Sequence, residues 1–462
     1  MLIPMILLMC LGVSSSWDPI NLQLYKARSA VKKSDNRQAS LAYAAAAGYS
    51  PWRLDFWELA GIFALETGNP QEAKSYLSRV SHSGELSAAG LKALGDIQKS
   101  EGDMQSAIKS WERAVLLTGD DIDLHTRLVN AYRQNEDLSS AVQHLSRISE
   151  LEPTDIETNY QLGLLLAATK PEAALAYLTL AAELDPSLAE NTSQLIQNIR
   201  FARNADDPSY SLVSAGQSLL SLEEWELAEI ALEHAVEINP EYSDAWAYLG
   251  EALQHTGQGG FEEISNALHL DPESLAANTI MGLYWQRQDR FDLALIYLYA
   301  ASQLDERNPA LQAEIGNTLG QMGNLPSAEI HYRQSVELAP KNPSYWRMLA
   351  NYYIQYETKL RDEGLAAARQ AVILDPENPE SLDVMAQIYL LLDNPLIAQR
   401  FLAKALSIDS GYAPAHLHMG LIHIIEGKSL EAYQRFSLAR DLSDPESETA
   451  IQANRLLQTH FP

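Results

Sequence analysis

The sequence offers few side chains whose type and spacing could perform chemistry. His416 and His423 lie seven residues apart in "HLHMGLIHIIEGK", and imidazole nitrogens are common metal ligands. On a helix this spacing corresponds to about two turns, roughly 10 Å, so the two rings are too far apart to share one ion. We therefore expect packed histidines here, and no metal site.

Signatures of other chemistry are also missing from the sequence. Cys10 is the only cysteine, which excludes an intramolecular disulfide and a zinc site built from thiolates. The chain contains no nucleophile elbow, P-loop, dinucleotide fingerprint or HExxH motif. Acidic pairs such as Asp120–Asp121 lie in predicted turns, where carboxylates normally cap helices. The chain is predicted to be non-enzymatic and to use no cofactor.

The overall charge limits the class of partner. The chain has 462 residues and a formal net charge of -28. Binding of phosphates requires a concentrated basic surface, so nucleic acid is not expected as a partner. The acidity favours solubility and attraction to basic proteins.

Residues 1–16 form a distinct segment. "MLIPMILLMCLGVSSSW" is an apolar run followed by small residues, which resembles the hydrophobic region of a signal peptide, with Val13 and Ser15 at a cleavage site. However, no basic residue precedes the run and five follow it, which disfavours export. We predict a signal or membrane-targeting segment, and hence an exported or membrane-tethered protein. The alternative is a frayed hydrophobic start on a cytoplasmic protein.

A repeated pattern runs along most of the chain. Small residues recur in the same local setting along the chain. In most cases the residue follows a predicted turn, and it is followed by a large apolar residue four positions later and by another small residue seven positions later. Neighbouring members are mostly 34 residues apart, and the longest interval is 54 residues. The series is Ala39, Ala73, Ala107, Ala141, Ala174, Ala228, Gly260, Ala294, Ala328, Gly364, Ala398 and Ala432. Such a period is typical of stacked repeats.

Each unit is predicted to be a pair of helices. The first helix carries apolar residues at helical spacing, as in Trp346, Leu349 and Tyr353. A turn containing Gly or Asp follows, and the second helix carries the small residues, which let two helices approach closely. A proline such as Pro340 commonly ends the unit, because proline cannot continue a helix.

These units resemble the tetratricopeptide repeat (TPR) family. Residues 311–340, "LQAEIGNTLGQMGNLPSAEIHYRQSVELAP", and residues 246–257, "WAYLGEALQHTG", follow its pattern: Trp, Leu-Gly and Tyr, a turn Gly, spaced alanines and a closing Pro. The resemblance covers roughly residues 20 to 445. It implies an all-α fold, a right-handed superhelical solenoid of antiparallel helix pairs with about twelve repeats.

The interval of 54 residues indicates a break in the array. It contains one unpaired helix, predicted at 187–203, and a polar segment after it. We predict about five repeats at 20–186, an extra helix and linker at 187–208, and about seven repeats at 209–445. The amphipathic tail at 446–462 is predicted to be a helix that caps the last repeat, because the end of a solenoid must be covered.

The resemblance implies that partners bind on the first helix of each pair, which lines the concave groove of such solenoids. Asn130, Asn317 and Asn351 share one groove position, and an amide can both donate to and accept from an extended peptide. Arg347, on the same helix as Asn351, could bind a carboxylate. These four residues are the predicted peptide-binding groove, which is similar to the TPR peptide clamps.

Glu380 and Asp383 stand where such clamps carry basic residues, so capture of an acidic chain end is not expected. The predicted function is a scaffold that binds protein or peptide partners, including basic ones. Two alternatives stay open: a cell-envelope assembly or lipid-handling factor, and a repeat arm associated with an enzyme. Leu417, Leu421 and Ile424 form an apolar stripe, which the C-terminal helix is expected to cover.

Overall fold

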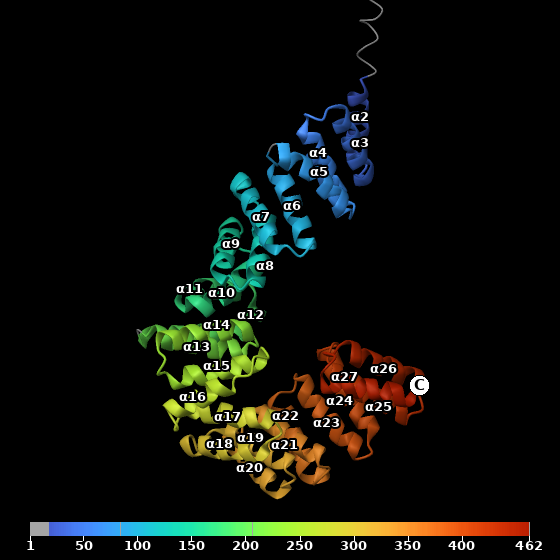
Figure 1. Cartoon of the computed structure of the whole chain (residues 1–462). Helices are drawn as coiled ribbons and strands as arrows, with labels where there is room; N and C mark the ends of the chain where they lie inside the picture. Colours follow the sequence, from blue (N-terminus) through green and yellow to red (C-terminus); the bar gives the residue numbers. More distant parts are fainter. Residues whose placement is uncertain (1–17, 84, 206, 462) are drawn as a thin grey trace, which may run out of the picture. The chain divides into compact units, whose positions relative to one another are not determined.

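The computed structural model describes residues 18–83, 85–205 and 207–461, so the predicted targeting segment at 1–16 lies outside the described residues. Throughout the described part the regular structure is helical, without strands (Figure 1). The chain divides into two compact units, the first ending at Ala231 and the second beginning at Leu232. The predicted all-α fold is confirmed.

The first unit is a row of antiparallel helix pairs. Its helices are α2 (Pro19–Lys32), α3 (Asn36–Tyr49), α4 (Leu54–Glu66), α5 (Pro70–Ser83), α6 (Ala88–Ser100), α7 (Met104–Thr118), α8 (Ile122–Gln134), α9 (Leu138–Leu151), α10 (Ile156–Thr169), α11 (Pro171–Leu184), α12 (Pro186–Ala202), the short η1 (Arg203–Ala205), α13 (Pro208–Ser221) and α14 (Trp225–Ile238), which spans the division between the units. Each of the five pairs from α2–α3 to α10–α11 is in contact.

The unpaired α12 contacts both α11 and α13. The division between the two compact units falls within α14 rather than at residues 187–208. The division into two arrays at 187–208 stays a prediction.

The second unit continues the same arrangement. Its helices are α15 (Ser243–His255), α16 (Phe261–Leu270), α17 (Leu275–Arg287), α18 (Phe291–Leu304), α19 (Pro309–Gln321), α20 (Leu325–Leu338), α21 (Pro343–Gln355), η2 (Leu360–Gly364), α22 (Leu365–Leu374), α23 (Pro379–Leu391), α24 (Pro395–Ile408), α25 (Ala413–Ile425), α26 (Ser429–Asp441) and α27 (Glu448–His460). Six contacting pairs, α15–α16 to α25–α26, precede α27. Together with the five pairs of the first unit, eleven contacting pairs are found among the described residues.

The contact within each pair depends on the small residues of the repeat series. Every alanine of that series is 0% exposed. A methyl group at this position leaves room for the facing helix, so ridges of one helix fit the grooves of the other. The first helices of successive pairs also contact each other, from α19 to α21, α23, α25 and α27. They form one continuous face of the second unit.

Two irregular turns are accommodated locally. Gly260 begins α16 with a left-handed φ of 93°, and a side chain there would collide with the carbonyl oxygen of Gly250. This close approach explains the glycine-rich turn at 255–260. The two additional residues of the unit at 343–378 are absorbed by η2, a single π-helical turn between α21 and α22.

A buried carboxylate holds that π-helical turn. Glu329 of α20 has a side chain only 13% exposed, and it accepts hydrogen bonds from Lys359 at 2.7 Å and from Tyr353 at 3.0 Å. Arg333 binds both Glu329 and Glu363, each at 3.0 Å. The network ties α20 and α21 to the turn and so fixes the position of α21, which carries Arg347.

The C-terminal helix covers the last pair. Leu457 of α27 packs in one apolar cluster with Leu417 and Phe436, and Leu421 and Ile424 are partly buried against the same cluster. The apolar stripe of α25 is thus in contact with α27.

We predict that Gly95→Ala destabilises the first unit by about 1–3 kcal/mol, because overpacking of a filled interface displaces its neighbours. A Cβ at Gly95 would lie 2.6 Å from Cδ1 of Trp111, whose ring is 1% exposed. The matched control is Gly48→Ala, where no heavy atom lies within 4 Å. Urea unfolding followed by circular dichroism measures both, and equal stability of the two variants would contradict the close contact.

Candidate functional site

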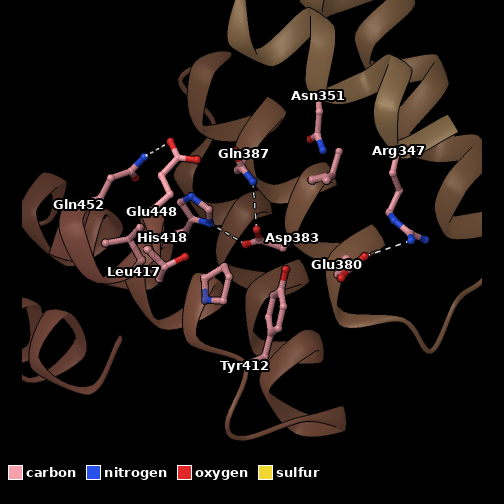
Figure 2. A pocket seen from close by; sticks show the side chains of 13 residues that line it. Arg347, Asn351, Glu380, Asp383, Gln387, Tyr412, Leu417, His418, Glu448 and Gln452 are labelled. Atoms are coloured by element: carbon pink, nitrogen blue, oxygen red, sulfur yellow. Dashed lines mark hydrogen bonds and ion pairs between the residues drawn. The ribbon is translucent and has the colours of Figure 1, made fainter. Parts of the chain in front are cut away.

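A pocket opens on the face formed by α21, α23, α25 and α27 (Figure 2). Its volume is about 410 Å³. The polar and apolar side chains that line it include Arg347, Asn351, Glu380, Asp383, Gln387, Tyr412, Leu417, His418, Glu448 and Gln452. Three successive helix pairs and the C-terminal helix therefore contribute to one site.

Arg347 is engaged by its own neighbours. Its guanidinium lies 3.0 Å from the Glu380 carboxylate and donates to the hydroxyl of Ser344 at 3.1 Å. The Arg347 side chain is 16% exposed, whereas that of Glu380 is 57% exposed. A carboxylate ligand would have to compete with Glu380 for this cation. Glu380, one of the two acidic residues that depart from the clamp pattern, is thus the partner of Arg347.

Asp383 and His418 form a buried pair beside it. Nδ1 of His418 donates to Oδ1 of Asp383 at 2.7 Å, and Gln387 donates to the other carboxylate oxygen at 3.0 Å. The side chains of Asp383 and His418 are 2% and 14% exposed. Burial by itself lowers the pKa of His418, but the charge and hydrogen bond of Asp383 outweigh it, and the pKa of His418 is raised.

This pair was not predicted from the sequence. His418 lies 35 residues after Asp383, close to the repeat length, and residues one repeat apart occupy adjacent first helices. A search for opposite charges at that separation would have found it.

The C-terminal helix adds a further carboxylate to the pocket. Gln452 donates to Oε1 of Glu448 at 2.8 Å. Burial, together with the nearby carboxylates, raises the pKa of Tyr412, which also lines the pocket. The pocket therefore contains three carboxylates, Glu380, Asp383 and Glu448, and one permanently charged cation, Arg347.

The structure brings two of the four predicted groove residues together. Arg347 and Asn351 line the pocket, and Asn351 is exposed. Asn317 is exposed on α19 outside the pocket; its side chain hydrogen-bonds Glu314, whose pKa is nevertheless raised by burial. Asn130 is exposed on α8 of the first unit. Peptide binding by these residues stays a prediction.

In "HLHMGLIHIIEGK", His416 is hydrogen-bonded by protein groups, whereas Nδ1 of His423 has no hydrogen-bond partner in the described part of the chain. His416 is 3% exposed, and its Nε2 lies 2.9 Å from the carbonyl oxygen of Ser410. Its Nδ1 lies 2.8 Å from Arg435, so both ring nitrogens have protein partners. His423 lies 3.4 Å from Glu426. Within the described residues no group of three or more metal-binding side chains occurs.

None of the described helices combines the length and the apolar character needed to cross a membrane.

Comparisons with known proteins agree with the repeat assignment. Tetratricopeptide repeat models match residues 24–79 and 310–342. The chain is 23% identical over 295 residues to TPR repeat-containing protein YpiA of Bacillus subtilis (strain 168), covering 63% of this chain and 65% of that protein. It is 25% identical over 170 residues to anaphase-promoting complex subunit 7 of Arabidopsis thaliana, covering 37% and 30%.

Among solved structures, yeast Tom70 aligns with a TM-score of 0.41 and 16% identity, over 81% of this chain and 95% of that one. The chain spans less than two thirds of the length of both curated relatives. Tetratricopeptide repeats are therefore present in both compact units of this chain.

The Asp383–His418 pair predicts a pH dependence of stability. The folded-state pKa of His418 is raised above 6.5, so the pair stabilises the second unit fully below pH 6.5, and this stabilisation is lost as pH rises through the folded-state pKa. At low pH the free energy of unfolding of His418→Gln should be about 1–3 kcal/mol lower than that of wild type. The loss of stability with rising pH that His418 causes in wild type should be absent from this variant.

Urea unfolding between pH 5 and pH 9 measures this dependence. His460→Gln, which alters an exposed histidine of α27, is the control and should keep the wild-type profile. If His418→Gln also keeps that profile, His418 is not the titrating group.

Proposed function

We propose that this protein is a non-catalytic scaffold that binds an extended segment of a partner protein around the pocket of the second unit. The observation that carries the proposal is the convergence of side chains from three successive helix pairs and α27 on one opening. An extended segment lying across these helices would contact several repeats at once. Each repeat would then add one side chain to the recognition.

The chemistry of the lining favours a basic segment. Glu380 retains a largely exposed carboxylate although it pairs with Arg347, and Glu448 adds a second one. The net charge of -28 would attract a basic partner over a longer range. Asn351, which also lines the pocket, would exchange hydrogen bonds with a peptide backbone. Leu417 and Val384 supply apolar contact within the same lining.

The pairing of the titratable groups supports a non-catalytic role. Both oxygens of Asp383 accept hydrogen bonds. In the part of the chain that the structure describes, the one hydrogen bond of His418 goes to Asp383, and no serine, threonine or cysteine side chain donates to its ring. A general base acting on a nucleophile requires such a contact. The arrangement is instead that of a structural pair which leaves polar groups at the rim available for binding.

A cell-envelope role is a second candidate, and its support is the apolar run within residues 1–16. In that case, partner binding would take place at a membrane.

Affinity capture with the full chain tests the groove. The double variant Asn351→Ala/Glu448→Lys should recover the partner at least about fivefold less well than wild type, because it removes an amide contact worth about 1 kcal/mol and opposes a basic ligand. The control is Asn130→Ala, the exposed asparagine of the first unit, which should recover the partner as wild type does. Undiminished recovery with the double variant would refute binding at this pocket. Circular dichroism confirms that each variant is folded.

A further inference from the structure

The first helix pair differs in charge from the rest of the protein. Residues 18–50 contain five basic and two acidic side chains, whereas the whole chain has a net charge of -28. Both acids cap helices: Asp18 accepts from the backbone of Ile20 at 3.1 Å, and Asp35 from that of Gln38 at 3.0 Å. The basic residues are Lys26, Arg28, Lys32, Lys33 and Arg37.

These five cations are free for an external partner. All five are exposed, and none forms an ion pair with the described residues, in contrast to Lys74 and Lys92 farther along the same unit. Because the acids are occupied as caps, the surface presents its positive charge to the surroundings. A concentration of unpaired cations on an acidic protein indicates an anionic partner.

Large apolar side chains accompany the cations on α2. Ala27 and Ala30 face the core, and the 100° turn per residue places Leu22 and Tyr25 on the opposite side. Leu22 is 54% exposed and Tyr25 is 72% exposed. Arg28 and Lys32 fall on this outer side as well, and Lys33 lies at its edge. The outer side is therefore apolar in its first half and basic in its second.

Two further aromatic residues lie at the same end of the pair. Tyr49 ends α3 and is 54% exposed, and Trp52 follows in the turn to α4 and is 75% exposed. Because α2 and α3 are antiparallel neighbours, the end of α3 lies near the beginning of α2, where Leu22 and Tyr25 are. Tyrosine and tryptophan are the residues most enriched where a protein meets the headgroup region of a bilayer.

We propose that these side chains form a lipid-contact face that rests on an anionic phospholipid bilayer. This face consists of Leu22, Tyr25, Arg28, Lys32 and Lys33 of α2 together with Tyr49 and Trp52. Its aromatic rings enter the headgroup region, and its lysines bind the anionic headgroups. The sequence immediately before the face is an apolar run. This assignment is independent of the pocket of the second unit.

Vesicle flotation of the full chain tests the proposal. Binding is compared on phosphatidylcholine vesicles with and without phosphatidylserine. Residues 1–17 contain no charged side chain and are the same in wild type and variants, so they do not account for a difference in lipid preference between them. A change in the preference for phosphatidylserine therefore reports the contribution of the substituted lysines to binding. Wild type should bind better to the vesicles that contain phosphatidylserine. The partition coefficient of Lys32→Gln/Lys33→Gln on these vesicles should fall about fivefold for each cation removed, and on vesicles without phosphatidylserine it should equal that of wild type.

Two further variants complete the test. Tyr25→Ser/Trp52→Ser should weaken binding several-fold to both kinds of vesicle, because the aromatic contact does not depend on lipid charge. Leu117→Ser is the control, since Leu117 is 63% exposed on α7, outside the face, and it should bind as wild type does.

Two results would overturn the proposal. One is a wild-type chain without preference for phosphatidylserine, and the other is an unchanged preference in Lys32→Gln/Lys33→Gln. Sedimentation of the same samples reports whether a second copy of the chain covers the face instead. If wild type self-associates without binding to vesicles, and Lys32→Gln/Lys33→Gln abolishes the self-association, the face belongs to the contact with that copy.

Discussion

The close contact between the two helices of each pair is the constraint on which the rest of the structure depends. It is made at positions where only a small side chain fits, and the alanines there are fully buried. Because each pair presents the same apolar edges to the next, the helices α19, α21, α23, α25 and α27 stack into a continuous face of the second unit. The polar side chains on that face are not needed for this stacking, so they are available for other interactions.

Those polar side chains are organised mainly by pairs between adjacent repeats. Arg347 binds Glu380, and Asp383 binds His418, in each case from one first helix to the next. Half-buried charges are costly unless they are paired, so these contacts hold the lining in place while leaving acceptors at the rim. The pocket is consequently a preorganised acidic surface rather than a set of isolated side chains.

The charge of the molecule is divided unequally along the chain. The body is acidic and its pocket carries carboxylates, whereas the first helix pair carries unpaired cations beside exposed aromatic rings. These two surfaces suit different partners, a basic protein segment and an anionic bilayer. A repeat protein can combine such surfaces because each repeat contacts mainly its neighbours, so one end can change without altering the packing elsewhere.

The helix pairs, their period, the buried alanines and the all-α class are predictable from the amino-acid sequence, because each of them follows from a local pattern that recurs in every repeat. The same pattern indicates Arg347 and Asn351 as polar residues that the packing does not require. Which residues share a site depends on how the helices stack. Asn317 and Asn351 occupy the same repeat position, yet only Asn351 lines the pocket, because the pocket is also built from α23, α25 and α27. The 35-residue separation of Asp383 and His418 made a contact between adjacent first helices predictable, but only the stacked helices show that the two side chains meet.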